Sequence, residues 1–260
     1  MRHGYPRFVP HDPRRHVDLE AVHNFRDLGG YETADGRRVR WGRVFRADGL
    51  YRLTNDDVVR LSPLGLRTVI DLRTADELVE RGTFPLDLHP VEFHHLSIID
   101  RTWDVDEAEE WGDDQAGFLR SKYHAMLRQG GDKVGDALRI ISGAENCPVV
   151  FHCAAGKDRT GLVAGMLLAG LGVDDATIAA DFALSAAAGA RTRAWAMDKS
   201  PELTERFATM PEVFYAAHPE SITGLLDDLR DAHGTIRAFC RTIGVDESHW
   251  DALEDHLLTA

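Results

Sequence analysis

The sequence has few cysteines and no long hydrophobic run. Three cysteines in 260 residues, an odd number, do not make a disulfide framework and are typical of a reducing compartment. The longest nearly unbroken apolar stretch, Gly161 to Val173, is shorter than the roughly 18 residues that cross a bilayer. The first 16 residues contain no apolar segment typical of secretory signals. We therefore expect a cytoplasmic protein that does not insert into membranes.

Positive charges are outnumbered by negative ones, and the sequence shows no cluster of residues at metal-ligand spacing. The sequence contains 30 lysines and arginines and 43 aspartates and glutamates, which gives a formal net charge of -13. A surface this acidic repels nucleic-acid phosphates and anionic lipids, which argues against a general nucleic-acid binder. His94-His95 lacks clustered partners at metal-ligand spacing, so we expect no metal site. The 43% of hydrophobic residues are nevertheless enough for a packed core.

What the sequence does contain is an alternation of strand and helix patterns. Short apolar runs are typical of buried strands, and the segments between them carry helical periodicity or helix stop signals. Strands are expected at 67–72, 91–99 and 148–151, and helices at 75–81, 115–128, 133–142 and 160–171. This order predicts an α/β fold with a mainly parallel central sheet and helices on both faces. Beyond Asp174 the pattern is almost entirely helical.

The N-terminal part carries turn signals. Three prolines interrupt a polar stretch, so residues 1–16 are expected to form a flexible arm before a single domain at 17–260. Asp35-Gly36 suits a tight turn and predicts a hairpin of two short antiparallel strands within residues 31–46.

The segment PVVFHCAAGKDRTG, residues 148–161, carries the chemistry. A short strand pattern ends in a cysteine, and a loop containing a glycine then opens a helix. Such a loop points backbone N–H groups at one position, where the helix dipole adds positive potential. The backbone of Ala154, Ala155 and Gly156 is therefore predicted to bind a tetrahedral dianion. The glycine lets the chain pass close to that ligand.

Side chains of this segment have the properties of catalytic groups. Arg159 comes six positions after Cys153, so its side chain can reach back across the loop. Its planar guanidinium group can then donate two hydrogen bonds to phosphate oxygens. Cys153 lies in the same field, which we expect to lower its thiol pKa from ~8.5 into the range of roughly 3.5–7.5. Thr160 can hydrogen-bond the sulfur or cap the helix. The alternative, a buried structural cysteine, gives no reason for the Gly, Lys and Arg that follow it.

The spacing from Cys153 to Arg159 matches the C-x5-R signature of the cysteine-dependent protein tyrosine phosphatase superfamily. More narrowly, HCAAGKDRTG resembles the bacterial group of tyrosine phosphatases that also dephosphorylate lipids. Further segments resemble that group: NFRDLGG at 24–30, GRVFRA at 42–47, DLR at 71–73 and ADFALS at 180–185. The resemblance covers about residues 22–258. It implies a tyrosine phosphatase-like fold and a phosphocysteine intermediate, with no metal and no cofactor.

The resemblance also assigns roles. Cys153 is the nucleophile, Arg159 binds the transferring phosphoryl group, and Lys157 with Asp158 marks the subgroup. Lys157 would add a cation for a second phosphate or a carboxylate, and a solvated loop lysine is the alternative.

The general acid has more than one candidate. Many superfamily members take it from a WPD loop or from an aspartate well before the cysteine, but this sequence has no WPD and no acidic residue at 115–131. A carboxylate beside a dianion is repelled unless it is protonated or turned toward the leaving group. Asp158 is therefore the favoured acid, and Asp100, Asp104 and Asp106 are alternatives.

Charged residues outside the loop are candidates for support. Asp71 and Arg73 end a predicted strand on the side where ligands bind in open α/β sheets. Arg26 and Asp27 are expected to form an ion pair that buttresses the loop or to touch substrate, with a plain salt bridge as the alternative. His152 is expected to be held by a hydrogen bond beneath the loop rather than to act as a base.

Two further features bear on access to the site. Cys147 and Cys240 are expected to be core or surface thiols, and a protective disulfide between Cys147 and Cys153 is the alternative. The family places a helical lid over the active site, which corresponds to residues 182–220. Ordinary helix packing is the alternative for this segment.

We interpret the sequence as a cytoplasmic tyrosine phosphatase of the dual-specificity kind, acting on phosphotyrosine-type monoesters through a phosphocysteine. The expected partner is a phosphorylated protein or a phosphoinositide, and no motif specifies an oligomeric state. The alternatives are a phosphoinositide or inositol-phosphate phosphatase and a phosphate-binding module without turnover. Intact Cys153, Arg159 and Thr160 argue against the module. The Lys157-Asp158 pair and NFRDLGG argue against a sulfurtransferase or arsenate reductase.

Overall fold

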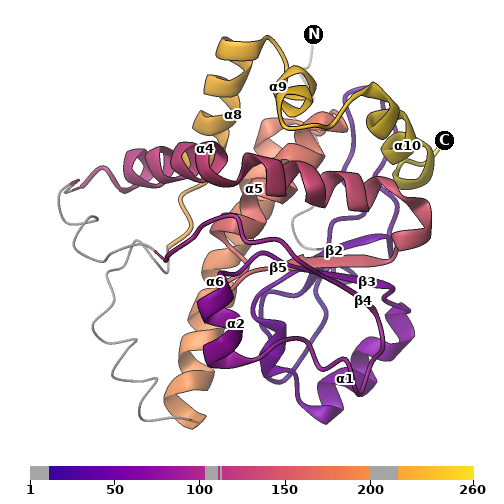
Figure 1. The fold of residues 1–260 in the computed structure, drawn as a ribbon, viewed down its shortest axis with the longest axis vertical. Helices are drawn as coiled ribbons and strands as arrows, with labels where there is room; N and C mark the ends of the chain where they lie inside the picture. The colour runs from indigo at the N-terminus through magenta and orange to yellow at the C-terminus, as the bar shows by residue number, and fades with distance from the viewer. Residues whose placement is uncertain (1–11, 103–110, 112, 200–215) are drawn as a thin grey trace, which may run out of the picture.

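A five-stranded sheet of order β1-β2-β5-β3-β4 forms the centre of the protein (Figure 1). The computed structural model describes residues 12–102, 111, 113–199 and 216–260. The strands are β1 (Arg26–Asp27), β2 (Val44–Ala47), β3 (Thr68–Asp71), β4 (Glu92–His95) and β5 (Val149–His152). β2, β5, β3 and β4 run parallel, and β1 pairs with β2 in the antiparallel sense. The predicted α/β fold with a mainly parallel sheet is confirmed.

The sheet separates two apolar cores. On β5, Val149 and Phe151 point into one core and Val150 points into the other, as the alternation of side chains along a strand requires. Because a parallel sheet is covered on both faces, the central strand β5 carries apolar side chains on both sides, which is why a short run such as 148–151 predicts it.

Helices cover both faces of the sheet, as predicted. In Figure 1 the larger layer lies above the sheet, and α1 and α2 lie below it. The upper layer contains α4 (Gln115–Ser142), α5 (Asp158–Gly170), α8 (Pro219–His233), α9 (Ile236–Thr242) and α10 (Glu247–Leu257). The lower side holds α1 (Asn55–Leu61) and α2 (Ala75–Arg81). α6 (Asp175–Lys199) packs against α5 and α8 and extends downward in this view. None of the described helices is both long and apolar enough to cross a membrane.

α4 joins the two helices predicted at 115–128 and 133–142 into one kinked element. Gly130 has non-helical backbone angles inside it. A Cβ at this glycine would lie 2.2 Å from the carbonyl oxygen of Ile98, so the kink forms where α4 presses against a neighbouring segment. That contact is distant in sequence, and the local pattern does not reveal it.

The N-terminal expectations need two corrections. Residues 12–16 are not a free arm, because Arg15 is buried, donates to the carbonyl of Asp27 at 2.7 Å and stacks 3.8 Å from the ring centre of Tyr31. Residues 1–11 lie outside the described residues. The turn at Asp35-Gly36 forms, and its flanks pair through backbone hydrogen bonds such as Val39 N–H to Tyr31 O at 2.9 Å, but this pairing forms an isolated bridge between Glu32 and Arg38 rather than two strands.

Candidate active site

The loop between β5 and α5 forms the centre of the candidate site. β5 ends at His152, Cys153 follows at the carboxyl end of the strand, and α5 begins at Asp158. Gly156 has a φ of 66°, and a Cβ there would lie 2.5 Å from the carbonyl oxygen of Ala47. The chain can therefore follow this path only with glycine at this position.

The carbonyl groups of the loop point outward to donors on other segments. Gly49 N–H donates to Ala154 O at 3.1 Å, Asn24 Nδ2 to Ala155 O at 2.9 Å, and Arg46 Nη2 to Gly156 O at 2.8 Å. In a trans peptide the N–H group points opposite to the carbonyl. The next N–H groups, those of Ala155, Gly156 and Lys157, therefore face the inside of the loop, where a tetrahedral anion fits.

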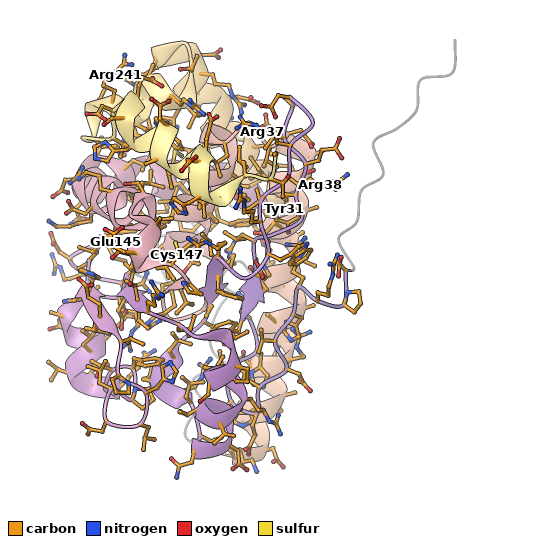
Figure 2. All side chains as sticks on the ribbon, turned by 90° about the vertical axis from the view of Figure 1, so that its right-hand side faces the viewer. Tyr31, Arg37, Arg38, Glu145, Cys147 and Arg241 are labelled. Carbon is orange, nitrogen blue, oxygen red and sulfur yellow. The ribbon has the colours of Figure 1, made fainter. Side chains whose placement is uncertain are left out.

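A buried cluster of charges holds two of these donors. Asp181 on α6 accepts from Arg26 Nε at 2.9 Å and from Arg46 Nη1 at 2.5 Å, and Tyr31, labelled in Figure 2, donates to it at 2.9 Å. Arg26 also donates to the side chain of Asn24. Although burial opposes ionisation, the guanidinium groups hold the pKa of Asp181 well below its usual range.

The cluster leaves an excess of positive charge behind the loop. Burial, followed by the neighbouring Arg26, lowers the pKa of Arg46 to about 10, so Arg46 stays charged at neutral pH. Arg26 and Arg46 both pair with the single carboxylate of Asp181, so the cluster carries a net charge of +1 behind the loop. Removing one partner from such a buried pair typically costs about 3–5 kcal/mol, so the cluster is stable only when complete.

Arg159 is held by Glu77, a residue that the sequence analysis does not identify. Arg159 Nη1 and Nη2 lie 2.5 and 3.2 Å from the two carboxylate oxygens of Glu77 on α2, and both side chains are buried. Burial opposes ionisation, but Arg159 keeps the pKa of Glu77 below its usual value. Glu77 also accepts from Thr74 N–H in a capping box, the one local signal at this position.

Asp71 and Arg73 connect the loop to α2. Arg73 donates to the Asp71 carboxylate through Nε at 2.9 Å and Nη2 at 2.6 Å, and its Nη2 also donates to Gly82 O at 2.8 Å. His152 Nε2 lies 3.4 Å from the Asp71 carboxylate, while its Nδ1 lies 3.3 Å from Cys153 O. Burial lowers the pKa of His152, so this imidazole is neutral at neutral pH.

Asp158 and Lys157 lie where the loop enters α5. Tyr123 on α4 donates to Asp158 Oδ1 at 2.7 Å, and Lys157 Nζ lies 3.6 Å from the same oxygen. Lys157 also donates to Ala216 O at 2.9 Å and is 2% exposed, so the solvated-lysine alternative is wrong.

The other acid candidates lie elsewhere or are not described. Asp100 is exposed and accepts a hydrogen bond from Gln129. Asp104 and Asp106 lie outside the described residues, as does the part of the expected lid at 200–215.

One sequence-based expectation about pairing is wrong. Asp27 does not pair with Arg26; its carboxylate accepts instead from Gly29 N–H at 2.7 Å and Gly42 N–H at 2.6 Å, where it fixes a turn. The sequence shows that Arg26 and Asp27 are neighbours, but it does not show that Arg26 pairs instead with Asp181, which is far away in the chain.

Cys147 and Cys240 are buried core thiols, as expected, and the alternative of a disulfide between Cys147 and Cys153 is ruled out by distance. Cys147, labelled in Figure 2, precedes the amino end of β5 and Cys153 follows its carboxyl end. At about 3.3 Å per strand residue they are roughly 20 Å apart, far beyond disulfide reach. Burial raises the pKa of the Cys147 thiol to about 11 and that of Cys240 to about 12, so neither is a reactive thiol at neutral pH.

Thr160 lies in the first turn of α5 and is fully buried. Its Oγ1 has no hydrogen-bond partner among the described residues, so the structure contains neither of the two contacts expected for it.

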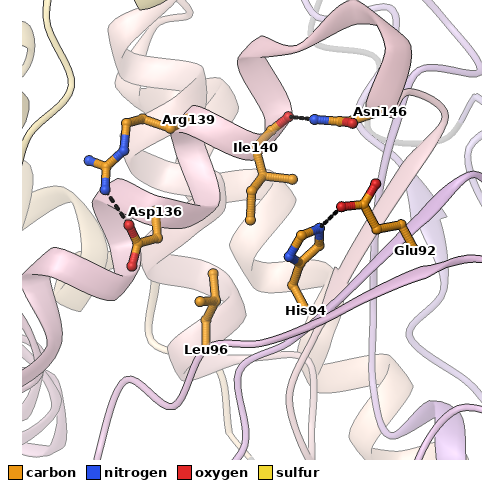
Figure 3. A pocket seen from close by; sticks show the side chains of 7 residues that line it. All are labelled: Glu92, His94, Leu96, Asp136, Arg139, Ile140 and Asn146. Atoms are coloured by element: carbon orange, nitrogen blue, oxygen red, sulfur yellow. Dashed lines mark hydrogen bonds and ion pairs between the residues drawn. The ribbon is translucent and has the colours of Figure 1, made fainter.

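A separate cavity of about 480 Å³ lies between β4 and α4 (Figure 3). The polar groups lining it bond largely to their neighbours: Arg139 pairs with Asp136, Asn146 donates to Ile140 O, and His94 lies 3.0 Å from Glu92. None of the loop residues lines it.

Comparison with known proteins gives consistent matches. The model of a family described as the tyrosine phosphatase family matches residues 17–259. The triple specificity protein phosphatase PtpB of Mycobacterium tuberculosis is 25% identical over 93% of this chain and 98% of its own length. A Cupriavidus necator protein named as a tyrosine-protein phosphatase is 32% identical over 65% of this chain and 62% of its own. A Nostoc commune tyrosine-protein phosphatase is 32% identical over 54% of this chain and 47% of its own. The chain thus spans less than two thirds of the last two relatives.

Proposed function

The chain belongs to the tyrosine phosphatase family, and on this basis we propose that it hydrolyses phosphotyrosine-type phosphate monoesters through a phosphocysteine. The observation that supports this most is the loop itself. The carbonyl groups of the loop accept hydrogen bonds from Asn24 and Arg46 on its outer side. Cys153 lies at the start of the loop, and Arg159, which follows it, is held by Glu77. A thiol in front of convergent N–H groups and a fixed cation is suited to phosphoryl transfer.

The first step forms a bond between Cys153 Sγ and phosphorus while the bond from phosphorus to the leaving oxygen breaks. Arg159 has five N–H donors, and Glu77 occupies two of them, so three can serve the equatorial oxygens. Asp158 gives its proton to the leaving oxygen. In the second step water attacks the phosphocysteine, the bond from sulfur to phosphorus breaks, and Asp158 takes the proton back from water.

Phosphate release from p-nitrophenyl phosphate and from a phosphotyrosine peptide tests this proposal. We expect turnover of both without added metal or cofactor. A folded protein that binds inorganic phosphate but turns over neither substrate would instead be a phosphate-binding module.

We expect Asp158→Asn to slow substrates with poor leaving groups, such as phosphotyrosine, by roughly the 10²–10⁴-fold that a general acid contributes. Turnover of p-nitrophenyl phosphate should fall much less, because p-nitrophenolate needs little protonation. The measurement is kcat on both substrates, with Asp100→Asn as the matched control. Asp100 is exposed and bonded to Gln129, so its replacement should leave both values unchanged. Equal losses on both substrates for Asp158→Asn would remove it as the acid.

A second candidate function is that of a phosphoinositide phosphatase, for which the cation of Lys157 beside the loop is the relevant feature. Its ammonium already contacts Ala216 O and lies near Asp158, so we expect it to organise the site rather than to bind a distal phosphate. Lys157→Ala should therefore lower activity on p-nitrophenyl phosphate and on a monophosphorylated phosphoinositide by a similar factor. A loss confined to the phosphoinositide would favour the lipid substrate and assign Lys157 to its second anionic group.

A further inference from the structure

Two donors converge on a single oxygen of Asp158. The Tyr123 hydroxyl donates to Oδ1 at 2.7 Å, and Lys157 Nζ lies 3.6 Å from that same atom. Both of these contacts are made to Oδ1 and neither is made to Oδ2. The two oxygens of this carboxyl group therefore have different surroundings.

We propose that Tyr123 is a positioning residue for the general acid: it holds Oδ1 as an acceptor, so that the transferable proton is carried by Oδ2. This rests on the proposed role of Asp158. An oxygen that accepts from a hydroxyl and faces an ammonium is a poor site for a proton, so the proton resides on the other oxygen. During the first step the O–H bond at Oδ2 breaks and the proton moves to the leaving oxygen. During the second step Oδ2 receives a proton from the attacking water.

The surroundings of Tyr123 suit this role. Its side chain is fully buried in the core, where its ring and that of Phe182 pack in a T-shaped arrangement with ring centres 6.3 Å apart. Burial, followed by the nearby Asp158, raises the pKa of Tyr123 well above its usual value. The hydroxyl therefore remains a donor, and the helix α4 on which it sits fixes its direction relative to α5.

Tyr123→Phe tests the proposal with little change in packing, because only the hydroxyl is lost. We expect kcat to fall roughly tenfold for poor leaving groups, a fraction of the 10²–10⁴-fold of the acid itself, and to change little for p-nitrophenyl phosphate. The measurement is kcat over a series of aryl phosphates whose leaving groups differ in pKa. A purely structural role would lower all rates in the series equally.

Tyr31→Phe is the matched control. It removes the hydroxyl of another buried tyrosine, which donates to a different carboxylate, Asp181. Because Asp181 bonds to the arginines behind the loop, any loss in this variant should be uniform across the leaving groups. Thermal unfolding of each variant confirms that the compared proteins are folded.

The double variant Asp158→Asn/Tyr123→Phe separates the two proposals. If Tyr123 acts through Asp158, losing its hydroxyl in the Asp158→Asn background adds no further leaving-group dependence. A uniform loss for Tyr123→Phe, or an additive effect in the double variant, overturns the role of Tyr123 while Asp158 stays the acid. If Asp158→Asn itself shows no leaving-group dependence, the assignment of the acid is what fails.

Discussion

Cys153→Ser is expected to reduce phosphate release by at least roughly a thousandfold, as loss of a covalent nucleophile does in other enzymes. The serine hydroxyl is nearly isosteric with the thiol but does not ionise at neutral pH. The loop itself should stay intact, because its carbonyls are held by Gly49, Asn24 and Arg46 rather than by the sulfur. We therefore expect the variant to bind inorganic phosphate with near-unchanged affinity, measured by calorimetry, while kcat on p-nitrophenyl phosphate is lost.

Cys147→Ser is the matched control for this experiment. Cys147 is buried in the same chain segment but precedes the strand that Cys153 follows, and burial raises its pKa to about 11. Its replacement should leave kcat unchanged, and iodoacetate should inactivate the Cys147→Ser protein as fast as the wild type. Residual activity above a tenth of wild type in Cys153→Ser would show that Cys153 is not the nucleophile.

The elements of the fold that the sequence predicts well are those whose signals are local. The helix at 75–81 is bounded on one side by a cap that uses Thr74 and Glu77 and on the other by Gly82, whose φ is 79°. Both signals act within a few residues of the helix that they bound. The buried strands at 68–71 and 149–152 are likewise marked by short apolar runs.

The partners of the loop between β5 and α5 could not be predicted in this way. Asp181 lies 155 positions after Arg26 and reaches it only because α6 packs beside the loop. The sequence places both residues in segments that resemble one family, but nothing in either segment indicates that they pair. Adjacent opposite charges at Arg26 and Asp27 suggested a simpler pair, which the geometry of the antiparallel strand does not form.

Glu77 illustrates a second reason why prediction fails. A glutamate three residues into a helix is explained fully by its capping role, and Glu77 does accept the N–H of Thr74. The same carboxylate also pairs with Arg159, 82 positions later in the chain. A residue with a sufficient local explanation thus carries a second role that only the packing of α2 against the loop reveals.

Charge around the loop is arranged in two opposed sets. Behind it, the cluster of Arg26, Arg46 and Asp181 carries a net positive charge. At its end, the ion pair with Glu77 compensates Arg159, so that this guanidinium is oriented without an uncompensated buried cation. In the proposed mechanism the first set attracts the phosphate dianion, and the second orients the Arg159 guanidinium that would bind its oxygens. A substitution of Arg159 that keeps its positive charge but removes its planar donor geometry can therefore show which of the two matters for activity.

Arg159→Lys keeps the charge and removes the planar geometry of the guanidinium. We expect it to lower kcat by on the order of a hundredfold or more, as does the loss of one preorganised hydrogen-bond donor to the transition state in other enzymes. The lysine keeps the positive charge but presents it as a single compact group. Arg159 can bond both oxygens of Glu77 and still direct its remaining donors at the equatorial oxygens. Lysine can satisfy Glu77 or the phosphoryl group but not both in a fixed geometry. Steady-state kinetics on p-nitrophenyl phosphate and phosphotyrosine measure the loss.

The expected loss is larger in kcat than in KM, because the fork contacts the equatorial oxygens most tightly as the transition state forms. Arg237→Lys is the matched control: Arg237 forms an ion pair with Glu254 and donates to Gly170 O, at the end of α5 remote from the loop. That variant should keep the wild-type kcat. The comparison separates the effect of losing the Arg159 guanidinium from the general effect of an arginine-to-lysine change. An unchanged kcat in Arg159→Lys would mean that charge alone suffices and that the bidentate contact with Glu77 has no part in positioning the catalytic group.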